Sequence, residues 1–400
     1  MNTVVQKYGG TSLGSIDKIA KIAKKICERK EQGFNIVVVV SAIGKTTDDL
    51  ISLSNQLSKN PEDIDLDLLM SAGEQISAAL VSIAIKEQGY DAIGLTGFQA
   101  GIITSNKHTK ARISNIKIDN IEKELNSGKI VVVAGFQGIA DDGTITTLGR
   151  GGSDTTAVAI AAKLNCTCEI YTDVDGIYTT DPRLFASAKK ISYISYEEML
   201  EMSSLGAGVM HSRSIELAQK YKIPIYVASS NMVNKGTYIK EQNEKMEERA
   251  VTGLSVNDND IMVTIGNFPY NPKLISDVFI KLAEEEINVD MISQTAPQNN
   301  NISISFTAPE SDSRLVKSIM KEYSSKYNLE IDIDAKITKV SVVGIGMRSQ
   351  SGVAASIFKV FADNDIKYKQ VTTSEIRITF TIDSYNKLKA VELLAEKFNL

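Results

Sequence analysis

The first half of the chain alternates short, continuous apolar runs with polar stretches that contain glycine. Apolar runs of this length are typical of strands that are covered on both faces of a sheet. The run at 36–40 predicts a strand of this kind, and strands are also predicted near residues 4–8, 91–97, 129–140 and 168–172. Segments with apolar residues at helical spacing lie between them, including Ile16, Ile19, Ala23 and Ile26 and a long amphipathic stretch at 71–89. Five or six strands with helical crossovers by residue 180 predict a mainly parallel, helix-covered sheet of the α/β class.

The segment 148–183 carries the densest candidate chemistry. It reads LGRGGSDTTAVAIAAKLNCTCEIYTDVDGIYTTDPR, which is a glycine-rich turn, a helix of small residues, a strand and a polar loop. The turn's glycines let a backbone approach a ligand closely. Ser153 and Asp154 stand at a helix N-terminus, which attracts anions, and Arg150 adds a planar donor group. Because ligands of open α/β sheets collect at the carboxyl ends of strands, the turn and the later loop predict one ligand site. The alternative is a plain turn followed by a helix cap.

A second glycine turn follows the first predicted strand. Gly9 and Gly10 come between this strand and a helix, which favours a turn that binds phosphate. Lys7 ends the strand, where its ammonium group can reach the same phosphate. The alternative for Lys7 is a solvated lysine at a strand end.

Two other polar stretches need a choice between a structural and a functional interpretation. SAIGKTTDDL contains GKTT but has Val39 where the P-loop pattern needs its first glycine, so Thr46 and Thr47 are interpreted as loop hydroxyls at a strand end. In SAGEQIS, Ser71 and Glu74 have the spacing of a capping box. Glu74 is therefore either part of a helix cap or a ligand-binding residue.

The second half of the chain contains an internal repeat. A helical stretch at 188–221 and a strand at 223–230 precede a polar, charge-rich segment at 235–250, which predicts a domain boundary. Beyond it, 276–294 aligns with 355–373, and ISISFT aligns with IRITFT after a shorter loop. Each copy predicts strand, helix, strand, strand, helix. The repeat has no nucleophile or acid–base pair, so it indicates a regulatory or associative role.

Composition narrows the possible functions. The chain has 400 residues, 43% hydrophobic and 23% charged, which is ordinary for two or three globular domains. The net charge of −5 and the lack of a basic stripe argue against a nucleic-acid binder. The longest apolar run, at 36–40, is too short to cross a membrane. Three cysteines without a zinc spacing indicate buried thiols and a cytoplasmic protein. With only two histidines, a mechanism that needs several is unlikely to apply.

Several motifs together resemble the aspartokinases. KYGGTSLGS, SAIGKTTDDL, SAGEQIS, TTLGRGGSDTTAVAIAA, TDVDGIYTTDPR and LGAGVMHSRSIE occur in the order and spacing of that family, and the repeat resembles its tandem ACT domains. The resemblance covers essentially the whole chain. It implies a three-layer amino-acid kinase domain at 1–245 and two ferredoxin-like ACT domains at 246–335 and 336–400.

The resemblance also implies an activity and a set of site residues. The activity is transfer of phosphate from ATP, with Mg²⁺, to the side-chain carboxylate of L-aspartate, the first step toward lysine, threonine and methionine. The implied substrate residues are Thr47, Glu74, Arg150 and Ser153, with Glu74 on the amino group and Arg150 on the α-carboxylate. The implied phosphate and nucleotide residues are Lys7, Gly9, Gly10, Asp154, Thr172, Asp173, Tyr178 and Arg183. No protein ligand for the metal is assigned.

Regulation is a further implication of the resemblance. An effector amino acid, lysine alone or together with threonine, is expected at Asn288, Val289, Asp290, Gln294, Val353, Ala354, Ser374 and Glu375. The alternative for Val289 and Val353 is a core position. The ACT repeats imply a homodimer or higher oligomer. Met246 could start a separate regulatory subunit, as in some relatives.

The sequence departs from the family at one segment and leaves two other functions open. Relatives have LGAKVLHPRS, whereas this chain has Gly208 for the lysine that approaches the nucleotide and Ser212 for the proline. The alternatives are another amino-acid kinase, acting on glutamate or acetylglutamate, and a catalytically inactive amino-acid sensor. The tandem repeat and Glu74 argue against the first, and Lys7, Arg150, Asp154 and Asp173 together argue against the second.

Overall fold

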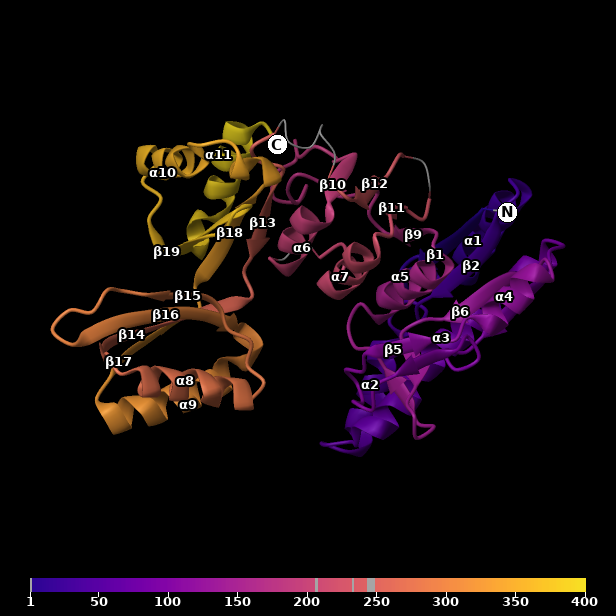
Figure 1. Ribbon diagram of the computed structural model, residues 1–400, viewed down its shortest axis with the longest axis horizontal. Helices are drawn as coiled ribbons and strands as arrows, with labels where there is room; N and C mark the ends of the chain where they lie inside the picture. The colour runs from indigo at the N-terminus through magenta and orange to yellow at the C-terminus, as the bar shows by residue number, and fades with distance from the viewer. Residues whose placement is uncertain (1, 206–207, 232–233, 243–248) are drawn as a thin grey trace. The chain divides into compact units, whose positions relative to one another are not determined.

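A computed structural model describes residues 2–205, 208–231, 234–242 and 249–400, and the chain forms two compact units (Figure 1). The first unit is Met1–Ile177, Lys190–Ser204 and Gly208–Met246. The second is Tyr178–Lys189, Leu205–Ala207 and Glu247–Leu400. The expected boundary at 245/246 and the possible start at Met246 lie outside the described residues. The division into domains therefore stays a prediction, and each unit is described by itself.

The first unit is built on an eight-stranded sheet with the order β10-β12-β11-β9-β1-β2-β6-β3. All neighbours are parallel except β11 and β12. The strands are β1 (Thr3–Tyr8), β2 (Asn35–Val40), β3 (Ala92–Leu95), β6 (Ile130–Ala134), β9 (Thr167–Thr172), β10 (Tyr193–Ser195), β11 (Ile225–Ser229) and β12 (Thr237–Lys240). The valines of β2 are fully buried because helices cover both faces. The expectation of a largely parallel α/β sheet is confirmed.

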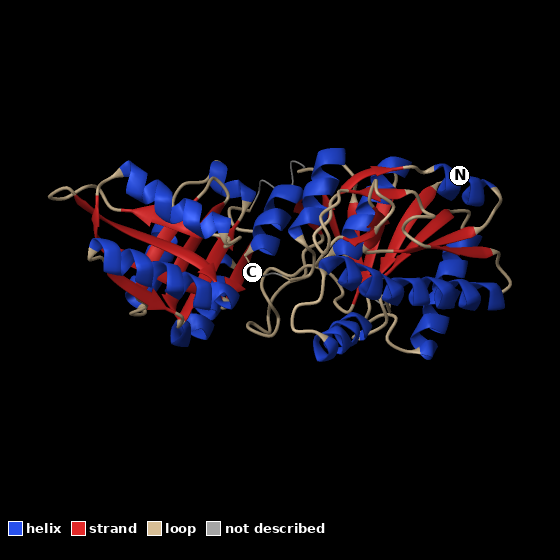
Figure 2. Cartoon of the chain, turned by 90° about the horizontal axis from the view of Figure 1, so that it is seen from below, coloured by secondary structure: helices blue, strands red, loops and turns tan. Residues whose placement is uncertain are grey.

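Helices pack on both faces of this sheet (Figure 2). The described helices of the unit are α1 (Ile16–Glu31), α2 (Thr46–Leu57), α3 (Asp63–Glu87), α4 (Asp119–Asn126), α5 (Gly152–Leu164), α6 (Tyr196–Ser204) and α7 (Ser212–Tyr221). Of these, α2 packs on α3, and α7 packs on α5 and α6. α1 and α3 form a core with the side chains of Val4 and Tyr8. Because side chains alternate along a strand, Lys7 points to the opposite face, where α5 contacts β1. This alternation directs the lysine toward the N-terminus of α5.

A smaller sheet of the first unit was not expected from the sequence. Its order is β5-β4-β7-β8, from Ile113–Ile116, Ile102–Thr104, Gln137–Ile139 and Ile145–Thr147. The apolar run at 129–140 supplies both β6 and β7, because the chain turns at Phe136, whose φ is 69°. Strand β8 leads directly into the glycine-rich turn before α5.

Two predictions about helices in the first unit need correction. Ile16 was expected on a buried face, but it is the first residue of α1 and is 67% exposed. The helix expected at 71–89 begins eight residues earlier, at Asp63. By length and composition, α3 could cross a membrane. However, half of its most apolar 18-residue segment is buried inside the unit, which is typical of a core helix.

The second unit contains the two repeats as two four-stranded sheets with equivalent orders, β15-β16-β14-β17 and β19-β20-β18-β13. The first uses β14 (Asp260–Pro269), β15 (Asp290–Gln294), β16 (Asn301–Pro309) and β17 (Glu330–Asp334), with α8 (Pro272–Glu284) and α9 (Ser313–Tyr327). The second uses β13 (Gly253–Asn257), β18 (Ile337–Val343), β19 (Tyr368–Thr373) and β20 (Arg377–Asp383), with α10 (Val353–Asp363) and α11 (Lys387–Phe398). The predicted repeat is confirmed. The fourth strand of the first sheet, β17, follows the first copy, whereas the fourth strand of the second sheet, β13, precedes both copies.

Candidate functional site

Lys7 and Asp154 form the centre of the candidate site. Lys7 is the penultimate residue of β1, and Asp154 is in the first turn of α5. The Lys7 Nζ and Asp154 Oδ1 atoms lie 2.7 Å apart, and their side chains are 11% and 12% exposed. The parallel sheet therefore brings together two residues that are far apart in the sequence. A partly buried ammonium beside a helix N-terminus is suited to a phosphate group.

The first glycine turn packs against the loop after β2. A Cβ on Gly10 would lie 2.6 Å from the Ala42 carbonyl oxygen, so only glycine permits this approach. The Gly44 N–H donates to the Gly10 carbonyl oxygen over 3.0 Å. Gly9 and Gly10 were both expected to offer N–H groups to phosphate. That expectation needs correction for Gly9, because its N–H already donates to the Tyr171 carbonyl oxygen over 3.2 Å.

Glu74 lies in the middle of α3 and reaches the same loop. Its Oε1 accepts the Ala42 N–H over 3.0 Å. Gly73 makes this contact possible, because a Cβ there would lie 2.7 Å from the Ala42 Cβ. The capping-box interpretation is wrong, since α3 begins at Asp63 and Ser71 is inside the helix.

The second carboxylate oxygen of Glu74 gives the site its electrostatic character. Oε2 is buried and has no hydrogen-bond partner among the residues that the structure describes. Burial raises the pKa of Glu74 from 4.5 to about 7, and the hydrogen bond from Ala42 offsets only part of this effect. A buried acceptor of this kind can receive a cationic donor from a ligand.

The glycine-rich turn before α5 presents the other expected substrate residues. Gly151 has φ of 69°, and a Cβ there would lie 2.3 Å from the His211 Cβ, so glycine is required. Arg150 is exposed beside it, and Ser153 is buried in the first turn of α5. Thr47 was expected in a loop, but it is the second residue of α2 and is half-buried.

The segment before α7 shows what its two family departures change. Gly208 is exposed and carries no side chain that could reach a nucleotide. Ser212 is the first residue of α7, with His211 as the N-cap. Proline is also favoured at this first helical position, so serine there keeps the start of the helix.

The expected nucleotide residues divide between the two units. Thr172 ends β9, and its hydroxyl donates to Asp173 over 2.9 Å, both in the first unit. Tyr178 and Arg183 belong to the second unit. There the Arg183 guanidinium is 89% exposed and pairs with Asp181 at 2.6 Å. Their expected place at the nucleotide therefore stays a prediction.

The segment Tyr178–Lys189 is anchored within the second unit. The Leu254 N–H donates to the Thr179 carbonyl oxygen over 2.6 Å. Phe185 packs against the core of the second repeat. The Lys189 ammonium donates to the Asn399 carbonyl oxygen over 2.7 Å. The loop that follows β9 thus passes from one unit into the other.

Four of the eight expected effector residues line one pocket of about 580 Å³ in the second repeat. These are Val353, Ala354, Ser374 and Glu375. Sequence reasoning missed Arg348, which also lines the pocket and pairs with Glu375 at 3.1 Å. A carboxylate and a guanidinium at one pocket match the two charges of an amino acid. The only sequence signal for Arg348 was its place in the repeat's GIGMRSQSG segment.

The other four effector residues, Asn288, Val289, Asp290 and Gln294, do not line this pocket. Asp290 begins β15, and its carboxylate accepts the buried Lys339 ammonium over 2.9 Å. Lys339 also pairs with Asp260. Lys339 is in β18, so these ion pairs join the two repeats where β15 contacts β19. Asp290 is thus already neutralised by a lysine of the same chain.

Comparison with known proteins agrees with the fold and the motifs. The model of the amino acid kinase family matches residues 2–229, and an ACT domain model matches residues 340–398. Aspartokinase 2 of Bacillus subtilis is 45% identical over 402 residues, covering 100% of this chain and 98% of that protein.

Two solved structures of Escherichia coli aspartokinase III show the same fold. One, in complex with aspartate and ADP, has a TM-score of 0.83 at 23% identity, with 100% of both chains covered. The other, in complex with lysine and aspartate, has a TM-score of 0.79 at 24% identity, with 99% of both chains covered. The family model and the full-length relative show that this chain belongs to the aspartokinases, within the amino acid kinase family.

Proposed function

We propose that the chain transfers the terminal phosphate of ATP to the side-chain carboxylate of L-aspartate, giving 4-phospho-L-aspartate and ADP. This is the first step toward lysine, threonine and methionine. The observation that carries the proposal is the buried Oε2 of Glu74, which has no partner among the described residues. Glu74 binds Ala42, and Ala42 lies against Gly10 in the turn that follows Lys7. An anionic nucleotide has no cation to offer that oxygen, whereas an amino acid has an ammonium group.

Aspartate binds through its charges. Glu74 binds the amino group, and Arg150 binds the α-carboxylate as a planar, two-pronged donor. Thr47 and Ser153 add hydroxyl contacts. This arrangement leaves the side-chain carboxylate to face the phosphate site, where Lys7 lies.

Phosphoryl transfer depends on position and positive charge rather than on a general base. The nucleophilic carboxylate is already ionised at neutral pH, so no histidine is needed. The Lys7 ammonium stabilises negative charge on the transferring phosphoryl group, and Asp154 holds that ammonium in place. The Gly10 N–H and the N-terminal turn of α5 add dipoles of the same sign.

Mg²⁺ fits this donor set when it arrives with ATP. Among the residues that the structure describes, no three His, Cys, Asp or Glu side chains gather in a way that could hold a metal ion. Mg²⁺ prefers phosphate oxygens and water to an all-protein cage. When bound, it supplies charge neutralisation on the phosphates. Thr172 and Asp173 of the first unit add to the nucleotide site, whereas the place of Tyr178 and Arg183 at the nucleotide stays an expectation from the family resemblance.

The second unit regulates the reaction by binding an end-product amino acid, lysine alone or together with threonine. The pocket with Arg348 and Glu375 supports this proposal, since it offers a partner for each charge of an amino acid. The chain acts in the cytoplasm as a homodimer or higher oligomer, assembled through the repeats. The solved E. coli complex with lysine gives the class of effector to test first.

The test is ADP release with ATP, Mg²⁺ and a panel of acidic amino acids, with the acyl phosphate trapped as a hydroxamate. We expect hydroxamate from aspartate and not from glutamate or acetylglutamate. Activity on glutamate alone would reject the proposal in favour of another amino-acid kinase. Inactivity on all substrates, with effector binding retained, would favour the sensor.

A further inference from the structure

Asp67 is a buried carboxylate that the proposed reaction does not use. It lies on α3 and is 0% exposed. Asp67, Ser71 and Glu74 fall on the same face of the helix, because residues four and seven apart are neighbours there. Asp67 thus lies two turns before the residue that we assign to the amino group of aspartate.

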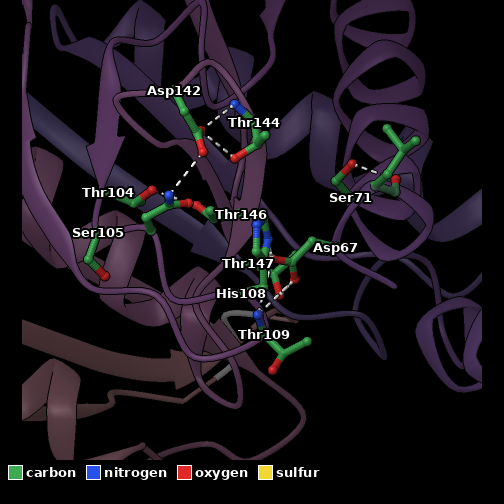
Figure 3. Close-up of polar contacts among 12 residues, drawn as sticks. Asp67, Ser71, Thr104, Ser105, His108, Thr109, Asp142, Thr144, Thr146 and Thr147 are labelled. Carbon is green, nitrogen blue, oxygen red and sulfur yellow. Dashed lines mark hydrogen bonds and ion pairs between the residues drawn. The ribbon is translucent and has the colours of Figure 1, made fainter. Parts of the chain in front are cut away.

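The Asp67 carboxylate gathers three residues from two other segments (Figure 3). Its Oδ2 lies 2.7 Å from His108 Nδ1. The Thr109 N–H donates to both oxygens, over 3.1 and 3.0 Å. The Thr147 hydroxyl donates to Oδ1 over 2.5 Å. With both oxygens occupied by protein groups, Asp67 positions its neighbours rather than binding substrate.

The residues that Asp67 holds lie directly against the glycine-rich turn. Thr147 ends β8, three residues before Arg150. A Cβ on Gly149 would lie 3.0 Å from the Thr109 carbonyl oxygen, and the Ala111 N–H donates to the Thr147 carbonyl oxygen over 2.9 Å. The loop 105–111 therefore forms one wall of the turn.

Two further features indicate that the loop 105–111 is held in a fixed conformation. Thr109 has φ of 60°, an uncommon conformation for a β-branched residue, and its N–H is fixed by Asp67. Arg213 of α7 donates to the carbonyl oxygens of Leu148 and Ala111 over 2.9 and 2.8 Å. The turn is thus held between α3 on one side and α7 on the other.

We propose that Asp67 and His108 are positioning residues that hold the 147–150 turn so that Arg150 meets the α-carboxylate of aspartate. The proposal rests on the proposed function only for the identity of the ligand. His108 Nδ1 supplies a hydrogen-bond donor to the buried Asp67 carboxylate. Without it, the charge of Asp67 is compensated only by the Thr109 N–H and the Thr147 hydroxyl.

The test compares His108→Ala, which removes the donor, with His108→Asn, whose amide nitrogen can replace Nδ1. We expect His108→Ala to raise the aspartate KM about tenfold, the order expected for a lost hydrogen bond to a charged group, while the ATP KM changes less than about twofold. His108→Asn should restore most of the wild-type value. Asn106→Ala is the matched control, since it removes the bond from Asn106 to Asp142 in the same loop and leaves Asp67 untouched.

A second measurement keeps the positioning role separate from the identity of the substrate. Amide hydrogen exchange of the ligand-free enzyme follows Leu148 and Gly152, whose N–H groups donate to Phe136 and Gly149. We expect faster exchange there in His108→Ala than in wild type or His108→Asn, with α1 unchanged. Unchanged exchange would overturn the positioning role whatever the substrate is.

The KM values decide whether the position of the turn affects aspartate binding. Faster exchange without a change in the aspartate KM would overturn the link to aspartate. Equal rises in both KM values would indicate general damage to the unit and would also overturn the proposal. A wild-type enzyme inactive on aspartate would reject the proposed function, while the exchange data would still decide whether Asp67 and His108 hold the turn.

Discussion

Replacing Glu74 with glutamine should change how the stability of the protein depends on pH. Burial raises the pKa of Glu74 from 4.5 to about 7 in the folded protein. The folded state therefore favours the protonated carboxyl group. The stabilising contribution of that proton is fully present below pH 4.5 and is lost as the pH rises through about 7. Glutamine does not titrate, so Glu74→Gln lacks this dependence.

The size of the effect follows from the two pKa values. Each pKa unit corresponds to about 1.4 kcal/mol, so the gap from 4.5 to about 7 amounts to about 3 kcal/mol at pH 8. A domain of this size changes its melting temperature by about 2–4 °C per kcal/mol, which gives about 6–12 °C. Glutamine places an NH₂ group where Oε2 has no partner, which adds a cost of its own. That cost is the same at every pH, so it cancels when the pH dependence is compared.

Differential scanning calorimetry of the wild type and Glu74→Gln from pH 5 to pH 8 measures this difference. The difference in melting temperature should appear only in the unfolding transition of the first unit, because Glu74 lies in that unit. The melting temperature of Glu74→Gln should rise relative to that of the wild type as the pH increases. Glu87→Gln, at the exposed end of α3, is the matched control and should follow the wild type. A difference between Glu74→Gln and wild type that stays constant from pH 5 to pH 8 would refute the reasoning.

Four other outcomes are expected. In the wild type, the aspartate KM should fall as the pH rises from 6 to 8, because the amino group of aspartate needs an ionised Glu74; a flat profile would contradict this. Arg150→Ala should raise the aspartate KM by about tenfold or more, whereas Lys7→Ala should mainly lower kcat in the same assay. Glu375→Gln should raise the lysine concentration that half-inhibits the enzyme; insensitivity of the wild type to lysine and threonine would count against regulation. Gly73→Ala should lower the free energy of unfolding, measured with denaturant, by about 1–3 kcal/mol and should raise the aspartate KM, because the new Cβ would clash with Ala42.

The strands that could be predicted are those buried on both faces. β1 and β2 were expected at 4–8 and 36–40 and occur at Thr3–Tyr8 and Asn35–Val40. For β2 the reason is that a continuous apolar run has few other stable environments. The small sheet was missed because its strands have three or four residues, too few for a periodic pattern. The pairing of β13 with β18 could not be predicted either, since sheet partners depend on contacts that are distant in sequence.

The site was predictable where sheet geometry alone brings residues together. Lys7 lies near the carboxyl end of β1, where ligands of α/β sheets collect, and Asp154 lies in the first turn of α5, which packs against β1. Asp67 was not predictable, because an acidic residue in DIDLDLL at the start of a helix is usually solvated. The passage of the 173–183 loop from one unit into the other has no local signal, since it depends on packing of Phe185 in a distant core.

Lys7, Asp67 and Glu74 differ in how far other protein groups compensate their charges, and this difference bears on which ligand each can bind. Lys7 has Asp154 beside it, and Asp67 has its oxygens occupied by protein donors, so the fold itself compensates both charges. Glu74 has only the Ala42 N–H on one oxygen, and its other oxygen is buried without a partner. A buried acceptor left open costs stability, and such a cost is offset only when a ligand fills the position. A phosphate would be repelled there and an ammonium attracted. This contrast supports the proposed placement of the amino acid at Glu74 and of the nucleotide phosphates at Lys7, which is the order that transfer to a side-chain carboxylate requires.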